Sequence, residues 1–290
     1  MKIVLNSKFF AKLSVEQLGE KTVAFGYDGV DICIRSGHPI NVDNALKALP
    51  KAVRIWRSQG LVCSLATAEV TMNNPKTPDA EILYAACAEA SIPCLKIGFW
   101  RFNPGDDYWQ VIDTARADLE GFIALGEKFG VQTCYQIHSG PCIGSNCAGL
   151  MHLIKGFDPK YVGAYPDLGH LALDGEDYEM GLSMLHGYLS VVGIKDAMYV
   201  RQLERNTPLY IPSFVKVGDG CVDWHRALGA LCNVGFNGPL TVHTEYSFDE
   251  SIIRHVGYAE ISPPNLDQFA KEDVAYLRRV LSSLYHSEKP

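Results

Sequence analysis

The 290-residue chain lacks several features that would place it in a broad functional class. No window approaches about 18 unbroken apolar residues, so neither a membrane span nor a membrane partner is expected. The opening residues, MKIVLNSKFF, contain neither an apolar core of signal-peptide length nor a small-residue cleavage site, so no secretory signal is expected. The formal net charge of −7 disfavours a nucleic-acid partner, because phosphate binding needs clustered lysine and arginine.

The cysteines are scattered, and their odd count of nine cannot pair completely within one chain. Cys33, Cys63 and Cys134 each lie in an apolar run, which favours buried reduced thiols and therefore a cytoplasmic location. Cys142 and Cys147 lie closer together in an expected loop. Two cysteines without nearby partners make a poor zinc site, however, so we expect no metal there.

Eight short runs rich in apolar and β-branched residues are spaced along the whole chain. Such runs are typical of parallel strands that are covered on both faces. The expected strands are Lys2–Asn6, Gly29–Ile34, Leu61–Ala66, Cys94–Phe99, Val131–Ile137, Val162–Asp167, Leu189–Lys195 and Pro239–Glu245.

Helical patterns with start and stop signals separate these strands. In the first of them, Ser14 and Gln17 have capping-box spacing, and Gly26 is the expected stop. No linker rich in glycine, proline or serine divides the chain, and no GxGxxG follows the first strand, which removes the main support for a dinucleotide-binding sheet. We therefore predict one α/β domain over residues 1–290, folded as a (β/α)8 TIM barrel. The longest irregular stretch, Met198–Gly220, would lie on the active-site face and is a candidate lid.

Ionisable residues gather at the carboxyl ends of the expected strands, where barrel enzymes carry their active sites. The candidates in chain order are Arg35, His38, Lys96, Gln136, His138, Asp167, His170, Lys195, His243 and Glu245. Because side chains alternate along a strand, Gln136 and His138 share a face, as do His243 and Glu245. Carboxylates and imidazoles around a divalent ion would supply an acid/base pair beside a carbonyl and a cation for an enediolate.

These candidates differ in how strongly they indicate function. Taken singly, His38 and His138 are better explained as hydrogen-bonded structural histidines. Asp167 and His170 give a sharper signal, because a carboxylate and an imidazole close an otherwise apolar strand. Lys195 follows a run of apolar residues and glycine, which favours a functional role over a surface ion pair.

Six motifs that follow one another along the chain resemble those of a known superfamily. They are FGYDGVDI, YQIHSG, DLGH, GIKD, KVGDGCVDW and GPLTVHTEY. In this order they are similar to the strand motifs of the xylose isomerase-like TIM barrels, which include sugar isomerases and epimerases, inosose dehydratases and apurinic-site endonucleases. The resemblance covers nearly the whole chain and implies the same barrel fold.

The resemblance also implies a metal site, with departures. Epimerases of this kind bind one divalent ion through Glu, Asp, His and Glu on strands five to eight, and the two Glu move protons. Here the first Glu is replaced by Gln136 and the His by Gly193. The implied metal ligands are Gln136, Asp167, His243 and Glu245. Such a site would hold Mn²⁺, Mg²⁺ or Zn²⁺ with less anionic charge, and Gln136 cannot act as a base.

The expected activity is isomerisation or epimerisation of a sugar or keto-sugar through a metal-assisted enediolate, in carbohydrate metabolism. The expected catalytic residues are Glu245, His138 and Lys195, and the expected substrate-binding residues are Arg35, His38, His170 and Lys96. One alternative is a lyase on the same scaffold, meaning a dehydratase, a decarboxylase or an oxo-glycoside eliminase. Another is a barrel that binds a sugar without turnover. The expected partner is a small carbohydrate-like molecule, and because such barrels often pair, a homo-oligomer stays open.

Overall fold

The computed structural model describes residues 1–202, 209–246 and 265–287. Eight parallel strands form a barrel in the order β6-β5-β4-β3-β2-β1-β10-β7, and the bridges Ala164–Leu189 and Asp167–Gly193 close the ring between β6 and β7. The strands are β1 (Lys2–Asn6), β2 (Gly29–Cys33), β3 (Val62–Thr67), β4 (Cys94–Lys96), β5 (Gln132–Gln136), β6 (Val162–Tyr165), β7 (Val192–Ile194) and β10 (Pro239–Val242). The predicted (β/α)8 TIM barrel is confirmed.

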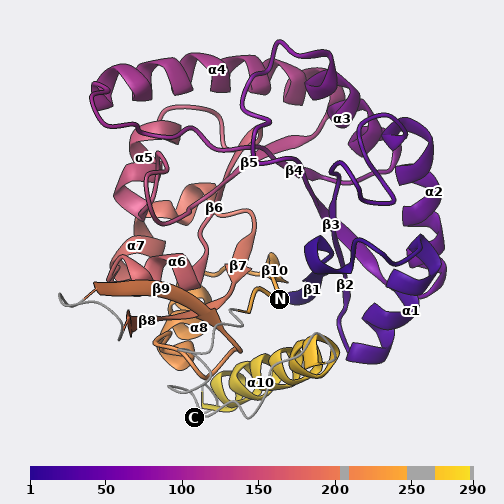
Figure 1. The fold of residues 1–290 in the computed structure, drawn as a ribbon, viewed down its shortest axis with the longest axis vertical. Helices are drawn as coiled ribbons and strands as arrows, with labels where there is room; N and C mark the ends of the chain where they lie inside the picture. The colour runs from indigo at the N-terminus through magenta and orange to yellow at the C-terminus, as the bar shows by residue number, and fades with distance from the viewer. Residues whose placement is uncertain (203–208, 247–264, 288–290) are drawn as a thin grey trace.

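Helices surround this ring of strands on the outside (Figure 1). They are α1 (Val15–Phe25), α2 (Ala45–Ser58), α3 (Pro78–Glu89), α4 (Tyr108–Phe129), α5 (Cys147–Ile154), α6 (Leu168–Leu173), α7 (Tyr178–Leu185), α8 (Trp224–Asn233) and α10 (Asn265–Ser287), with short 3-10 turns at Lys8–Phe10 and His186–Tyr188. The predicted capping box at Ser14 and Gln17 is present, and Gly26 ends α1 in the left-handed conformation. No helix among the described residues is long and apolar enough to cross a membrane.

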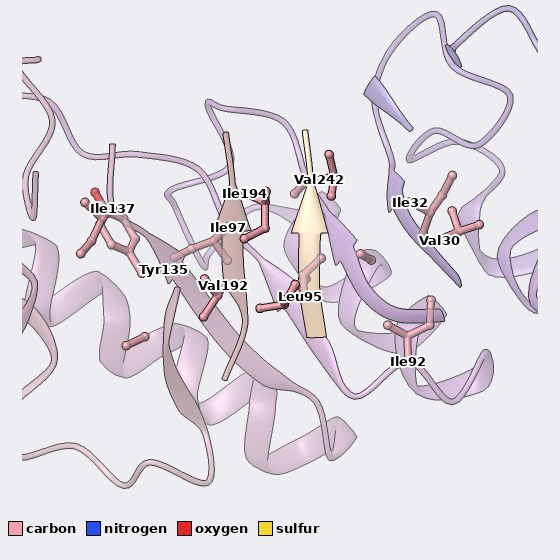
Figure 2. Close-up of a cluster of buried hydrophobic side chains, with 14 of the residues drawn as sticks. Val30, Ile32, Ile92, Leu95, Ile97, Tyr135, Ile137, Val192, Ile194 and Val242 are labelled. Carbon is pink, nitrogen blue, oxygen red and sulfur yellow. The ribbon is translucent and has the colours of Figure 1, made fainter. Parts of the chain in front are cut away.

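Alternate residues of each strand face opposite sides of the barrel wall, and the two sides differ in chemistry. The side toward the helices carries the main apolar core, to which Val30, Ile32 and Leu95 belong (Figure 2). The smaller apolar cluster is formed by Leu65, Cys94, Cys134, Tyr165 and Val191, which lie in the barrel strands or, for Val191, directly before β7. This pattern fits a packed barrel interior, filled by side chains rather than left as a pore.

Asp31 of β2 links four strands by hydrogen bonds. Its carboxylate accepts bonds from Asn6 Nδ2 (2.6 Å), Thr67 Oγ1 (2.8 Å) and Thr241 Oγ1 (2.8 Å). Asp31 is fully buried, and burial raises its pKa. This network fixes β1, β2, β3 and β10 relative to one another beneath the polar ends of the strands.

The connection after β7 contains an antiparallel hairpin that the sequence did not reveal. Strands β8 (Asp196–Gln202) and β9 (Leu209–Val215) pair from Asp196–Val215 to Gln202–Leu209, and Figure 1 shows them beside β7 and α6. The expectation of an irregular stretch over Met198–Gly220 is therefore wrong for residues 198–202 and 209–215, and residues 203–208 lie outside the described residues. Side chains alternate across β8, with Tyr199 exposed and Val200 buried, but both are apolar in type, so the sequence does not show this alternation.

Candidate functional site

Lys195 directly follows β7, and its ammonium group lies among acceptors from neighbouring elements. Lys195 Nζ is 2.7 Å from Glu245 Oε2, 3.1 Å from His170 Nε2 and 3.7 Å from Asp167 Oδ2. Burial alone would lower the pKa of Lys195, but Asp167 and Glu245 raise it above its ordinary value. Lys195 is therefore a fixed cation at the carboxyl ends of β6, β7 and β10.

Glu245, three residues past β10, is held by two lysines. Its Oε2 bonds to Lys195, and its Oε1 pairs with Lys8, which follows β1. Burial would raise the pKa of Glu245, but the two lysines lower it far below its ordinary value. Glu245 is therefore held as a carboxylate at neutral pH.

Asp167 lies at the end of β6 and caps α6. Its Oδ1 accepts the backbone N–H of His170, and its Oδ2 accepts Gln136 Nε2 at 2.8 Å. Asp167 is fully buried. A Cβ atom at Gly193 would lie 2.7 Å from Asp167 Oδ2, so only glycine allows this close approach of β7 to the carboxylate.

The rings of His138 and His170 contact each other beside this ion cluster, with centroids 4.0 Å apart and planes tilted by 36°. Burial and the charge of Lys195 lower the pKa of both histidines, so both are neutral near pH 7. The hydrogen-bond partners assign their tautomers. Lys195 can only donate, so His170 Nε2 accepts and His170 Nδ1–H donates to Ser139 Oγ at 2.9 Å. His138 Nδ1 lies 2.8 Å from the carbonyl oxygen of Ser139 and must donate, which leaves a lone pair on His138 Nε2.

Lys96, the last residue of β4, is a buried lysine with a perturbed pKa. It is 1% exposed, and its Nζ lies 3.8 Å from the centroid of the Phe99 ring. Burial lowers the pKa of Lys96 to about 7, and the nearby charge of Arg35 adds to this shift. The Phe99 ring also contacts the ring of His138, at 5.0 Å between centroids. Lys96 and His138 therefore contact the same aromatic ring, that of Phe99.

His243 forms a pair with a residue that was not among the candidates. The hydroxyl of Tyr165 lies 2.7 Å from His243 Nε2, and both side chains are buried. Burial, with Lys195 as the next cause, lowers the pKa of His243 to about 3, so this imidazole is neutral. Its Nε2 is thereby engaged within the protein.

Arg35 and His38 lie on the connection between β2 and α2, apart from the ion cluster. Arg35 Nε is buried and has no hydrogen-bond partner within the described part of the chain. The pKa of His38 is lowered by burial and by Arg35. The structure thus brings the other sequence candidates together and leaves these two at the side of the group.

Two cavities flank the rim of the barrel. One, of about 700 Å³, is lined by Phe99, Trp100 and Arg101 and by residues of the connection between β3 and α3, including Asn73. Its volume is in the range of sites for small molecules. The other, of about 230 Å³, is lined by Arg35 and Glu69 among others. Phe99 therefore joins the larger cavity to Lys96 and His138.

Several residues of the site were missed from the sequence. Lys8 lies just past the end of β1, and applying the strand-end rule to the first strand would have found it. Tyr165 precedes Asp167 by two residues, so period-two alternation would have found it. The centroid of the Phe214 ring, on β9, lies 5.2 Å from the centroid of the His170 ring and 4.9 Å from Lys195 Nζ. No signal pointed to Phe214, because the hairpin itself was not predicted.

The expected metal ligands do not fit a divalent ion as they are arranged. The Lys195 ammonium already lies between the carboxylates of Asp167 and Glu245. His243 Nε2 is bound to Tyr165, and the amide N–H of Gln136 points at Asp167. Among the described residues, no three or more His, Cys, Asp or Glu side chains are grouped as metal ligands. The ammonium of Lys195 would repel a second cation placed beside it.

Comparison with curated proteins finds distant relatives of one activity. The chain is 25% identical over 163 residues to the inosose dehydratase of Geobacillus kaustophilus, and 23% identical over 186 residues to that of Bacillus velezensis. The first match covers 53% of this chain and 51% of the relative, and the second covers 61% and 60%. The chain thus matches about half the length of the curated relatives.

Solved structures resemble the whole chain in fold. A D-tagatose 3-epimerase-like protein superposes with a TM-score of 0.75 at 13% identity, over 99% of both chains. A 3-keto-D-glucoside 4-epimerase from E. coli superposes with a TM-score of 0.72 at 15% identity, over 96% of this chain and 99% of its own. A barrel protein from Mycobacterium smegmatis in complex with magnesium gives 0.66 at 17% identity, over 98% and 97%. At these identities the likeness establishes the fold alone.

Family membership follows from a match that spans most of the sequence. The model of the xylose isomerase-like TIM barrel matches residues 20–279, which include seven of the eight barrel strands and every site residue discussed above except Lys8. The chain belongs to the xylose isomerase-like TIM barrel family.

Proposed function

We propose that the chain is an enzyme that removes a proton from a carbon next to a carbonyl group in a small sugar-like substrate and returns it to give an isomer or epimer. The observation that carries this proposal is the pairing of a fixed cation with a neutral base. Lys195 is a buried ammonium, and the ring of His138 contacts the histidine that Lys195 bonds to. The lone pair on His138 Nε2 has no hydrogen-bond partner among the described residues. Proton abstraction beside a carbonyl needs such a base and a positive charge for the developing oxyanion.

The ammonium of Lys195 has one N–H available for a substrate oxygen. Two of its three N–H groups bond to Glu245 and His170, whereas Asp167 Oδ2, at 3.7 Å, lies beyond hydrogen-bond distance. In the proposed reaction this N–H binds the carbonyl oxygen and stabilises the enediolate. The surrounding carboxylates hold the ammonium in place, so little reorganisation is needed as charge develops.

Lys96 supplies the second proton-transfer group. With a pKa of about 7 it is partly protonated at neutral pH and can return a proton to the enediolate. Return to the same carbon from the opposite face gives an epimer, and return to the neighbouring carbon gives an isomer. Arg35, whose Nε lacks a partner in the described part of the chain, is proposed to bind a substrate hydroxyl or carboxylate.

A lyase is the second candidate, and two observations favour it. Glu245 is bound by Lys8 and Lys195 and is not a free second carboxylate base, which suits an elimination that needs one base. The curated relatives matched by sequence are inosose dehydratases. In a lyase, His138 would remove the same proton, and the enolate would then expel a neighbouring hydroxyl group as water.

Solvent exchange tests the proposal and separates the two candidates. The protein is incubated in D₂O with D-tagatose, D-allulose, D-fructose, a 3-keto-glucoside and a keto-inositol, and the products are read by NMR and mass spectrometry. Deuterium in recovered substrate together with an epimer or isomer supports the proposal, whereas loss of water supports the lyase.

Two histidine variants make this test specific. We expect His138→Asn to slow exchange by about 10² to 10⁴-fold, which is the usual contribution of a general base. His152→Asn, which changes an exposed histidine on α5, should leave exchange unchanged. Binding of a sugar without exchange would instead support the sugar-binding barrel, and no exchange with any of these compounds would contradict the proposal.

A further inference from the structure

We infer that the ammonium group of Lys195 is the resident cation of this site and excludes a divalent metal ion from the place between Asp167 and Glu245. The magnesium complex among the structural neighbours shows that a barrel of this family can hold a divalent ion. The metal exclusion stands without the proposed function, whereas the role of the ammonium toward a substrate oxygen rests on it.

Charge balance is the first support for this inference. The two carboxylates at the site, Asp167 and Glu245, face two ammonium groups, those of Lys195 and Lys8. The remaining polar side chains in contact with them are neutral, because Gln136 is an amide and His170 Nε2 accepts a hydrogen bond from Lys195 and therefore carries no proton. A divalent ion placed here would meet no uncompensated negative charge.

The packing around Asp167 is the second support. Gln136 Nε2 donates to Asp167 Oδ2, the oxygen that faces Lys195, and Gly193 leaves no side chain between β7 and the carboxylate. A histidine at position 193 would place its Cβ 2.7 Å from that oxygen and displace it. Gln136 and Gly193 therefore fit a site in which Asp167 accepts a hydrogen bond from an amide and lies next to the ammonium group of Lys195.

The inference predicts that removing the ammonium creates a metal site. In a Lys195→Ala variant, Asp167 and Glu245 lose the cation between them, and the Nε2 lone pair of His170 is released toward the same space. Two carboxylate oxygens and one imidazole nitrogen are ligands that Mn²⁺ accepts. We therefore expect Lys195→Ala to bind Mn²⁺ where the unaltered protein does not.

A matched control comes from a second lysine held by two carboxylates. Lys216 Nζ lies 2.8 Å from Glu272 and 3.6 Å from Asp219, almost the same distances as at Lys195, but this group lies at the surface. Lys216→Ala also removes one lysine from two carboxylates and changes the net charge equally. It should gain no comparable Mn²⁺ affinity, because its carboxylates are solvated and lack the histidine.

The experiment is a Mn²⁺ titration of the full-length protein, first treated with EDTA and then dialysed, followed by calorimetry and by the electron paramagnetic resonance signal of free Mn²⁺. The inference is supported if the unaltered protein and Lys216→Ala show no saturable binding up to millimolar metal, while Lys195→Ala binds one ion at least about tenfold more tightly. It is overturned if the unaltered protein binds Mn²⁺ stoichiometrically, a result that does not depend on how the variant folds. It is also overturned if Lys195→Ala, shown to be folded by circular dichroism, binds none.

This titration is independent of the solvent-exchange assay. Metal binding by the unaltered protein would end the inference and leave the proposed proton transfer standing. If no solvent exchange is seen but Lys195→Ala binds Mn²⁺, the proposed function is contradicted and the metal exclusion is supported.

Discussion

The cost of removing Lys195 can be worked out by comparison with Lys216. Each lysine contacts two carboxylates at similar distances, 2.7 and 3.7 Å for Lys195 and 2.8 and 3.6 Å for Lys216. They differ in burial, because the side chain of Lys195 is 3% exposed and that of Lys216 is 23% exposed, with partners that are more exposed still. A difference in stability between their variants therefore measures the effect of burial.

We predict that Lys195→Met destabilises the fold by about 3 kcal/mol, because breaking a buried ion pair leaves an uncompensated charge. The value lies at the lower end of the usual range, since Glu245 keeps Lys8 and Asp167 keeps the amide of Gln136. Lys216→Met should cost less than about 1 kcal/mol, because solvent screens exposed pairs.

Equilibrium unfolding in urea at pH 7 measures both values. Adding Asp167→Asn to Lys195→Met should recover at least about 1 kcal/mol, because the stranded charge is then removed. The reasoning is refuted if Lys195→Met costs no more than Lys216→Met, or if the double variant is less stable than Lys195→Met alone.

Three further predictions concern pH, packing and the interior network. The rate of solvent exchange should have a bell-shaped dependence on pH. It should rise as His138, whose pKa is lowered, loses its proton below about pH 6.5, and fall as Lys96 loses its proton near pH 7. Lys96→Met should abolish the fall at alkaline pH, which a series of rate measurements against pH on each protein checks. Gly193→Ala should destabilise the protein by about 1 to 3 kcal/mol in urea unfolding, because the added Cβ overlaps Asp167 Oδ2; an unchanged midpoint would contradict the packing. Asp31→Ala should lower the free energy of unfolding by on the order of 3 kcal/mol, because it leaves three buried donors without an acceptor. A decrease below about 1 kcal/mol in urea unfolding would show that the hydrogen-bond network is dispensable for stability.

The barrel could be predicted because its pattern is local and repeats along the chain. Each apolar run corresponds to a strand, and the alternation of helices and strands with short connections leaves few other topologies. Six of the eight strands end one to three residues earlier than predicted, as in β4, which stops at Lys96 rather than Phe99. The residues beyond these ends leave the sheet and carry the polar side chains of the rim.

The location of the site could also be predicted, but the contacts within it could not. The strand-end rule finds Asp167, His170 and Lys195, since it depends only on where each strand stops. The acceptors of the Lys195 ammonium are set by the conformation of a long side chain and by the space that Gly193 leaves. The spacing of residues in the sequence predicts neither. The partner of His243 was missed for the same reason, since the Tyr165 hydroxyl reaches it across 78 residues of sequence.

Gln136 and Gly193, the two departures from the ligand pattern that the resemblance implies, both adjoin Asp167 in this structure. Restoring the carboxylate with Gln136→Glu would replace the amide donor, now 2.8 Å from Asp167 Oδ2, by a second negative charge. That charge would repel Asp167 and strengthen the hold on Lys195, so the ammonium would be retained rather than released. Restoring the histidine at Gly193 would force Asp167 away from its present partners. We therefore predict that neither reversal alone creates a metal site, and that the cation of Lys195 has to be removed first.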